Sequence, residues 1–286
     1  MALNLSVFRV RALSAIVFAV VMIGGLIWNQ WSFFLLFIAI QLGCLYEYQK
    51  LIALIYPSYK NISSVHKWGL LVLGTAMMFL LGPNSLGIKD ISMKFVGSKI
   101  VPVILGILII ADIVTKKINL QNWVISFFGL VYIPMNLSLF YQLKGFMANT
   151  FFADWSFSIP LLVIATVWVN DTMAYIVGAL IGRTPLSPIS PNKTWEGTIA
   201  GVILSVLLVT KVIGIWVPIQ EKFIFLISLI SAIMGNFGDL FESKLKRLAG
   251  VKDSGTMMPG HGGFLDRFDS ILLATPFVWL LLQILF

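Results

Sequence analysis

Residues 222–241 read KFIFLISLISAIMGNFGDLF, and this stretch decides the class of fold. Its apolar residues run over the length that a helix needs to cross the hydrocarbon core of a bilayer, about 20 residues for about 30 Å. We therefore predict a membrane-spanning helix here. The stretch also carries Asp239 near its end, and a carboxylate on an apolar span is costly unless it is paired or bound to a metal ion. Asp239 is therefore a candidate functional residue.

The composition of the whole chain agrees with this interpretation. Of its 286 residues, 59% are hydrophobic and 11% are charged, and the mean hydropathy is +0.95, whereas soluble domains carry about 25% charged residues. We predict an all-α, polytopic integral membrane protein in which Arg9 and Arg11 precede the first helix of the fold rather than a cleaved signal peptide. The predicted spans are about nine in number and cover residues 12–28, 32–48, 68–82, 100–115, 123–143, 158–181, 198–218, 222–241 and 270–286.

The distribution of Lys and Arg residues predicts the orientation. With the N-terminus in the cytoplasm, fourteen of the 20 Lys and Arg residues lie on the cytoplasmic side, as the positive-inside rule expects. This bias explains the net charge of +8, and no basic patch with interleaved aromatic residues indicates a nucleic-acid partner. The single cysteine, Cys44, lies in an apolar run, so we expect a buried, inert thiol and no disulfide. Two polar connections, 182–197 and 242–269, are then cytoplasmic.

Polar residues divide the chain into two predicted regions. Up to about residue 150 they are scattered, whereas most of the acidic residues lie beyond that point. We expect residues 1–150 to form transmembrane helices that serve as scaffold, lipid access or dimer contacts. Residues 151–286 are expected to form the catalytic transmembrane region.

A polar stripe emerges where the 222–241 span ends. Asp239, Glu242, Ser243 and Lys246 are spaced i, i+3, i+4 and i+7, so a continued helix carries all four on one face. An ordinary solvated helix end with a Glu242–Lys246 ion pair explains part of this pattern equally well. Asp239 favours a functional site, because its carboxylate is still attached to the apolar span.

A second polar segment, residues 252–269, reads KDSGTMMPGHGGFLDRFD. Asp266 and Asp269 share a face at the start of the last span, where they repel each other unless a cation lies between them. Oxygen ligands without a His or Cys cluster indicate a hard ion, and Mg²⁺ is usual where phosphates complete the coordination. Simple helix capping is the alternative for the pair alone. The glycines allow close approach of backbone amides to an anion, and the segment's cationic and hydrogen-bonding donors are Lys252, His261 and Arg267.

A third segment, residues 187–197, reads SPISPNKTWEG. It lies in a predicted cytoplasmic connection and holds Lys193 and Glu196 beside two prolines. A rigid loop of this composition is suited to clamping a phosphate, and it is equally suited to forming a stiff turn.

Acidic residues inside predicted spans are a further signal. Asp171 lies within NDTMAYIVGALIG, residues 170–182, and an ionisable residue at this depth is functional by default. Gly178 and Gly182 follow at a spacing that more often reflects close helix packing than ligand contact. For Asp112, in the fourth predicted span, we expect a snorkelling ion pair with Lys116 one turn away.

These residues together resemble the signature of the CDP-diacylglycerol synthases, also called phosphatidate cytidylyltransferases. The resemblance covers about residues 165–270 and includes the segments NDTMAY, SPNKTWEG and GDLFES in the family's order. Met258, Asn192 and Asn236 depart from the residues that the family commonly has. The matched signature positions are Ser243, Lys246, Arg247, Lys252, Asp253, Pro259, His261, Gly262, Gly263, Asp266, Arg267 and Asp269.

The resemblance implies a reaction of CTP with phosphatidic acid that gives CDP-diacylglycerol and pyrophosphate. It implies dependence on Mg²⁺, with a second cation such as K⁺. Separately, the compact length and the absence of a transit segment favour a bacterial inner membrane, and the glycine-spaced helices leave room for a homodimer among the membrane lipids. The implied metal ligands are Asp239 and Asp266 with Ser243 and Asp269, and the implied catalytic residues are Asp239, Lys246, Asp266 and Asp269. Asp253 is expected to support the basic residues. Substrate and phosphate contacts are expected from Asp171, Ser190, Lys193, Thr194, Glu196, Ser243, Arg247, Lys252, His261, Gly262, Gly263 and Arg267.

Two other functions fit parts of the pattern. A CTP-dependent kinase of a membrane alcohol, such as a polyprenol or phytol, needs the same nucleotide and metal chemistry. A cation-coupled transporter also has intramembrane carboxylates and helices interrupted by glycine. Label transfer from the α-phosphate of CTP to lipid separates the first from the cytidylyltransferase, and ion-dependent solute uptake without CTP identifies the second.

Overall fold

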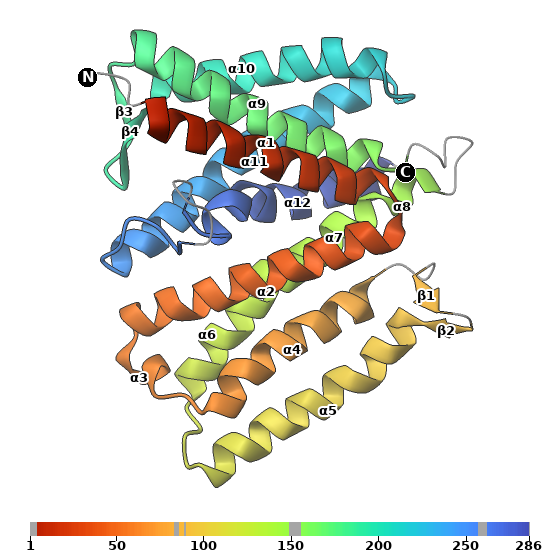
Figure 1. Cartoon of the computed structure of the whole chain (residues 1–286), viewed down its shortest axis with the longest axis vertical. Helices are drawn as coiled ribbons and strands as arrows, with labels where there is room; N and C mark the ends of the chain where they lie inside the picture. The colour runs from red at the N-terminus through yellow and green to blue at the C-terminus, as the bar shows by residue number, and fades with distance from the viewer. Residues whose placement is uncertain (1–4, 83–85, 89, 149–155, 257–261, 286) are drawn as a thin grey trace. The chain divides into compact units, whose positions relative to one another are not determined.

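A computed structural model describes residues 5–82, 86–88, 90–148, 156–256 and 262–285 (Figure 1). The described chain is mainly helical, as predicted, and its strands form two short antiparallel hairpins. By packing it divides into two compact units. The first consists of Met1–Ser138 and Leu248–Phe268, and the second of Leu139–Arg247 and Asp269–Phe286. Compact packing does not test the functional division predicted at residue 150, which stays a prediction.

The predicted membrane spans are largely confirmed. Helix α1 (Leu5–Ile27) corresponds to the first predicted span, and its apolar part, Ile16–Ile27, is shorter than the other candidate spans. The cytoplasmic position of the N-terminus stays a prediction. Within the described residues, eight helices are long and apolar enough to cross a membrane: Gln30–Ile55, Ser64–Leu81, Met93–Val114, Leu120–Leu143, Ser158–Ile181, Trp195–Ile215, Glu221–Leu248 and Leu265–Leu285.

The first unit is a set of antiparallel helices in which α2, α4 and α5 lie side by side (Figure 1). Asn29 begins α2 with a capping box, because its side chain accepts hydrogen bonds from the amides of Trp31 and Ser32. Cys44 is buried in α2 as a free thiol, as predicted. The elements are α1, α2 (Gln30–Ile55), α3 (Pro57–Lys60), α4 (Ser64–Leu81), β1 (Gly87–Ile88), β2 (Ile91–Ser92), α5 (Met93–Val114), α6 (Leu120–Leu130), the π-helical turn η1 (Val131–Met135) and the start of α7 (Asn136–Leu143).

The predicted Asp112–Lys116 ion pair is wrong. Helix α5 ends at Val114, so Lys116 lies beyond the helix and is not one turn along the same face. Asp112 is instead buried, where it accepts a hydrogen bond from Ser63 Oγ at 2.9 Å and contacts His66 Nδ1 at 2.5 Å. His66 Nε2 lies 2.9 Å from Ser126 Oγ. This buried polar chain ties α4, α5 and α6 together.

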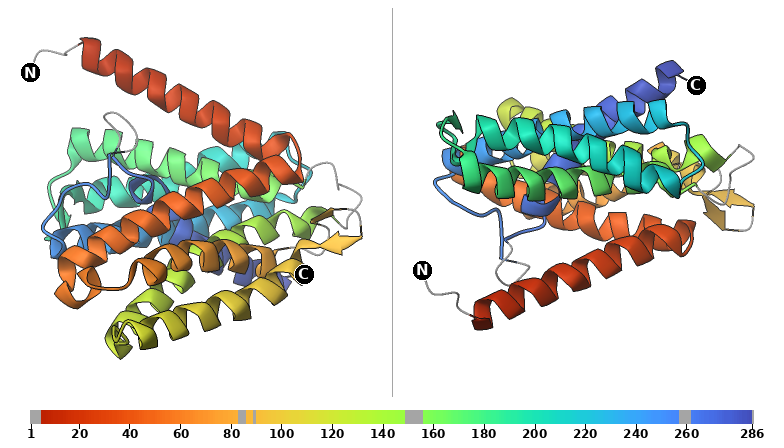
Figure 2. Two further views of the ribbon diagram at one scale, coloured as in Figure 1. Left: turned by 60° about the horizontal axis from the view of Figure 1, so that its bottom comes forward. Right: turned by 90° about the horizontal axis from the view of Figure 1, so that it is seen from above.

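The second unit contains a helical hairpin, in which α9 and α10 lie side by side and the strands β3 and β4 join them (Figure 2). The glycine spacing in α9 reflects close packing, as predicted, because a Cβ at Gly178 would lie 3.2 Å from Thr194 Oγ1 and 3.6 Å from Gly197 Cα. The elements that follow α7 are α8 (Gly145–Ala148), α9 (Ser158–Ile181), β3 (Pro185–Ser187), β4 (Ser190–Thr194), α10 (Trp195–Val212), the 3₁₀ turn η3 (Ile213–Ile215), α11 (Glu221–Leu248) and α12 (Leu265–Leu285).

Candidate functional site

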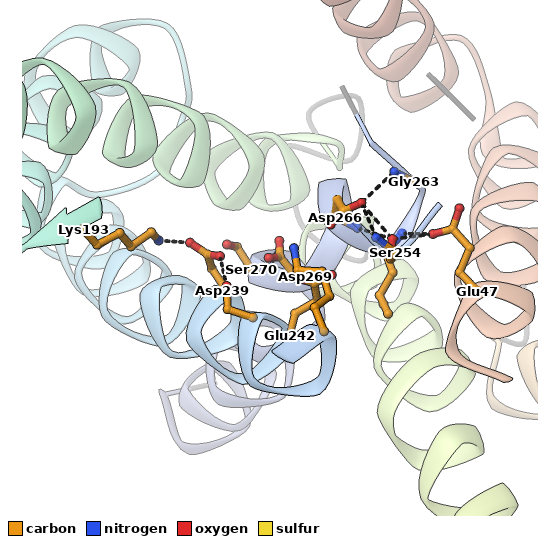
Figure 3. Close-up of polar contacts among 12 residues, drawn as sticks. Glu47, Lys193, Asp239, Glu242, Ser254, Gly263, Asp266, Asp269 and Ser270 are labelled. Atoms are coloured by element: carbon orange, nitrogen blue, oxygen red, sulfur yellow. Dashed lines mark hydrogen bonds and ion pairs between the residues drawn. The ribbon is translucent and has the colours of Figure 1, made fainter. Parts of the chain in front are cut away.

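Three carboxylates meet in the second unit. Asp239 and Glu242 lie on α11, which continues past the apolar span as predicted, and Asp269 lies on α12. One oxygen atom from each lies within 4.8 Å of the others (Figure 3). Glu242 and Asp269 are buried, whereas the Asp239 side chain is 25% exposed. Three hard oxygen donors at this separation fit a divalent cation such as Mg²⁺.

Two small residues allow these helices to approach each other. A Cβ at Gly238 would lie 3.0 Å from Ser270 Cα and closer still to the carbonyl oxygen of Asp269, so a side chain has no room there. At Gly235, one turn earlier, a Cβ would lie at the ordinary distance of 3.5 Å from Ser270 Cβ. The absence of a side chain at Gly238 therefore sets the distance between α11 and α12 where the carboxylates meet.

Two lysines accompany the carboxylates. The ammonium group of Lys193, on β4, forms an ion pair with Asp239 (Figure 3), and Lys246 Nζ lies 2.5 Å from Glu242 Oε2. Burial lowers the pKa of Lys193, and the negative charges of Asp171 and Asp269 oppose this shift. The Glu242–Lys246 pair considered from the sequence is therefore present, and it is part of the carboxylate cluster rather than an alternative to it.

A cavity of about 440 Å³ opens beside Asp239. Asn236 lies in its wall and is held by Asn170, since each side-chain amide donates to the other's oxygen at 3.3–3.4 Å. Asp171 follows Asn170 on α9 and also lines the cavity, and its contact with substrate stays a prediction. The other lining residues are Ala174, Tyr175, Gly178, Ala179, Ser190, Asn192, Lys193, Thr194 and Thr198.

An apolar groove of about 460 Å³ shares two lining residues, Thr198 and Asn236, with this cavity. Its wall comes from α10 and α11, with Leu186 of β3 at one end. Ile203 and Phe237 are each more than half exposed, so the groove opens on the surface that an apolar span presents to lipid. A polar cavity and an apolar groove thus meet at two residues.

The hairpin residues predicted to contact substrate have structural partners of their own. Glu196 accepts hydrogen bonds from the amides of Arg183 and Thr184 at 3.2 Å, which closes the base of the hairpin. Thr194 caps α10, because its Oγ1 accepts from the amide of Gly197. The segment is therefore a stiff turn that directs Lys193 toward Asp239, and its role as a phosphate clamp stays a prediction.

The first unit holds a second carboxylate network. Asp266 Oδ2 accepts hydrogen bonds from Ser254 N at 2.9 Å, Ser254 Oγ at 2.9 Å and Gly263 N at 2.7 Å (Figure 3). Gly262 has a φ of +82°, a left-handed conformation that glycine adopts without strain. Asp266 belongs to the first unit and Asp239 to the second. Asp266 therefore fastens the loop before α12, and its convergence with Asp239 on a metal ion stays a prediction.

Glu47 anchors the same loop from α2. Its carboxylate accepts hydrogen bonds from Ser254 Oγ at 2.7 Å, Phe264 N at 3.0 Å and Leu265 N at 2.9 Å. A side chain at Gly263 would collide with Glu47. The close approach of backbone amides to an anion, expected from the glycines, is thus present toward carboxylates of the chain itself. A phosphate contact by these glycines stays a prediction.

Two functional candidates were missed from the sequence. Glu47 was not considered, although a carboxylate within the apolar helix Gln30–Ile55 is as costly as Asp171 or Asp239. Glu242 belongs to the predicted polar stripe but is not among the predicted metal ligands. Among the other predicted positions, Ser243 Oγ lies 3.4 Å from Asp239 Oδ1. Arg247, Lys252 and Asp253 are exposed, Arg267 is half-buried, and His261 lies outside the described residues.

Comparison with known proteins shows which family the chain resembles. A model described as the cytidylyltransferase family matches residues 9–285. Among curated proteins, the phosphatidate cytidylyltransferase of Bacillus subtilis is 46% identical over 120 residues, 41% of this chain and 45% of the relative. That of Synechocystis is 44% identical over 51% of each chain, and that of Thermotoga maritima is 38% identical over 55% of this chain and 58% of the relative. The chain spans about half the length of the curated relatives it matches.

Proposed function

Because this chain belongs to the cytidylyltransferase family, we propose that it transfers the cytidylyl group of CTP to phosphatidic acid and releases pyrophosphate. The observation that carries the proposal is the cluster of Asp239, Glu242 and Asp269, which lies beside a polar cavity at the end of a membrane-length helix. The product is then CDP-diacylglycerol. The similarity to phosphatidate cytidylyltransferases supports the same reaction.

In this reaction an oxygen of the lipid phosphate bonds to the α-phosphorus of CTP, and the bond from that phosphorus to the bridging oxygen of the β-phosphate breaks. The electron pair leaves with pyrophosphate. A phosphomonoester has a second pKa of about 6, so its oxygen is already ionised near neutral pH and needs no strong base. The protein's task is to align two anionic reactants and to neutralise their charge.

We propose that Asp239, Glu242 and Asp269 hold Mg²⁺, which when bound neutralises phosphate charge and polarises the α-phosphate. The oxygen-only donor set and its 4.8 Å spread support this assignment. Ser243 and Asp266 remain candidate ligands, and a second cation such as K⁺ remains part of the proposal.

Residues of the chain supply positive charge next to these carboxylates. Lys193 and Lys246 each pair with one carboxylate of the cluster, so both ammonium groups are within reach of a triphosphate bound there. Arg247 follows Lys246 at the helix end. We assign these three residues to binding the phosphates of CTP and to stabilising the departing pyrophosphate.

The apolar groove beside the cavity supports a lipid acceptor. The groove and the cavity meet at Thr198 and Asn236, which suits a molecule with a polar head and an apolar chain. We propose that the lipid phosphate lies in the cavity near Asp171 while an acyl chain follows α10 and α11. A soluble phosphate acceptor would have no use for the groove.

The decisive experiment uses purified protein in mixed micelles, with CTP labelled at the α-phosphate and with either phosphatidic acid or a polyprenol. Label in the lipid fraction that depends on phosphatidic acid and Mg²⁺ is the expected result. Label that stays wholly in CDP while the polyprenol is phosphorylated would replace the proposal with the membrane-alcohol kinase. Absence of CTP consumption, together with ion-driven solute uptake in proteoliposomes, would replace it with a transporter.

We also infer that the protein resides in the inner membrane of a bacterium. Its apolar helices and its similarity to bacterial relatives support this location. A homodimer stays a prediction, which sedimentation or native mass spectrometry in detergent tests.

A further inference from the structure

A groove with a volume of about 830 Å³ lies in the first unit. It is formed by the antiparallel helices α2 and α4 and by the loop segment that precedes α12. Its size is within the range of ligand pockets, about 300–1,000 Å³. Every lining residue belongs to the first unit: Leu42, Gly43, Tyr46, Glu47, Lys50, Trp68, Leu71, Val72, Thr75, Gly255, Thr256 and Phe264.

One end of this groove is aromatic and carries Lys50, and Lys67 adjoins the lining residue Trp68. The rings of Tyr46 and Trp68 stack with their centroids 6.2 Å apart. Lys50 Nζ lies 4.5 Å from the centroid of the Tyr46 ring, and Lys67 Nζ lies 5.7 Å from the same centroid. Tyr and Trp are enriched where a membrane protein meets the lipid headgroups, so these four residues mark the headgroup level.

The ammonium groups of Lys50 and Lys67 both lie near the Tyr46 ring. Within the described part of the chain, neither Lys50 nor Lys67 is in an ion pair. Glu47 is the acidic residue in the lining, and its carboxylate is turned to the donors of Ser254 and the loop amides. Two like charges near one ring repel each other, and an anion that contacts both would relieve this repulsion.

The rest of the groove is apolar and open. Leu42, Leu71 and Val72 line it below the aromatic pair, and the side chains of Leu42 and Val72 are 37% and 49% exposed. Lys50 and Leu42 are eight residues apart on α2, which corresponds to about 12 Å along the helix axis. This length accommodates a substantial part of an acyl chain.

We propose that this groove binds an anionic glycerophospholipid, with its phosphate between Lys50 and Lys67 and one acyl chain along Leu42, Leu71 and Val72. Basic pockets between transmembrane helices are suited to anionic headgroups. A free phosphate would leave the apolar wall uncovered, and a neutral lipid would leave the two cations uncompensated. Its lining shares no residue with the cavity beside Asp239, so the proposal does not depend on the proposed reaction.

The test measures lipid binding to the full-length protein in neutral detergent by native mass spectrometry. The probe is dioleoyl phosphatidylglycerol, a phosphodiester that the proposed reaction does not consume, and dioleoyl phosphatidylcholine is the comparison lipid. At about fivefold in affinity for each lysine, the double variant K50Q/K67Q should bind phosphatidylglycerol about 30-fold more weakly. The matched control is K60Q, which removes an exposed lysine from the same helical hairpin end outside the groove, and its affinity should stay within twofold of wild type.

Four results would overturn the proposal. One is equal affinity of wild type and K50Q/K67Q for phosphatidylglycerol, and another is equal retention of phosphatidylcholine by the wild type. The third is displacement of the lipid by millimolar inorganic phosphate, which would assign the site to a free anion. The same spectra report oligomeric state, so conversion of a dimer to monomer in K50Q/K67Q but not in K60Q would assign the groove to a second copy of the chain. Thermal unfolding in lipid-free detergent verifies that both variants fold.

Discussion

Replacing Gly238 by Ala tests whether helix separation sets the geometry of the carboxylate cluster. The added Cβ would lie 3.0 Å from Ser270 Cα, whereas carbon atoms in contact are normally about 3.5–4.0 Å apart. The helices α11 and α12 must therefore separate by about 0.5–1 Å at this point. Because Asp239 and Asp269 adjoin it on the two helices, the separation carries the carboxylates apart.

The expected effect is larger on catalysis than on stability. Overpacking costs about 1–3 kcal/mol, and the higher helix propensity of Ala returns about 0.5–1 kcal/mol, so the protein should remain folded. A misplacement of about 1 Å can cost about 100-fold in rate. We therefore expect G238A to lower kcat for cytidylyl transfer by about 10- to 100-fold, with a modest fall in the thermal midpoint.

The matched control is G235A on the same helix. A Cβ at Gly235 meets its neighbours at ordinary distances of 3.4 Å or more, so this variant should keep its activity and gain slightly in stability. Both variants are assayed as purified protein with CTP labelled at the α-phosphate. Activity of G238A within threefold of G235A, with both folded, would refute the reasoning that this contact sets the site.

Three further substitutions examine the buried carboxylates. E242Q should reduce turnover at least 100-fold and raise the Mg²⁺ concentration needed for half-maximal rate. The control E221Q replaces an exposed, ion-paired acid on the same helix and should change neither quantity. Similar kinetics in both variants would remove Glu242 from the site. E47Q should lower unfolding free energy by about 1–3 kcal/mol and expose the loop before α12 to limited proteolysis, and unchanged cleavage would contradict its anchoring role. D112N should lower the free energy of unfolding by about 3 kcal/mol or more, since it alters a buried paired carboxylate. The control K116Q should have little effect on the melting temperature in detergent. Equal shifts in melting temperature for the two variants would support the pairing of Asp112 with Lys116.

Hydrophobic length made the membrane helices predictable. A run of about 20 apolar residues has few alternatives to a spanning helix, so the positions of eight spans followed from composition. Their ends did not, because helix ends depend on local caps and on packing. The helix containing Asp239 continues to Leu248, and the fourth span begins at Met93 rather than near residue 100.

Partners of buried charges were harder to predict than the charges themselves. Asp112 was recognised as an acid within a span, but the sequence offered Lys116 nearby and gave no sign of His66, 46 residues earlier. The partners of Glu47 are equally hidden in the sequence, since its hydrogen-bond donors lie more than 200 residues away. Spacing along one helix predicted which side chains share a face, as with Asp239 and Glu242. Spacing could not supply Asp269 as their neighbour within 4.8 Å, and only the family resemblance placed Asp269 with Asp239.

The hairpin between α9 and α10 governs where natural length variation is tolerable. Strand β4 carries Lys193 to Asp239 and ends at Thr194, which caps α10. An insertion at the exposed turn around Pro188 leaves this register intact. An insertion between Ser190 and Lys193 would rotate the lysine to the opposite face of the ribbon, since successive strand residues alternate in direction. Related chains should therefore accept insertions and deletions before the strand and reject them within it.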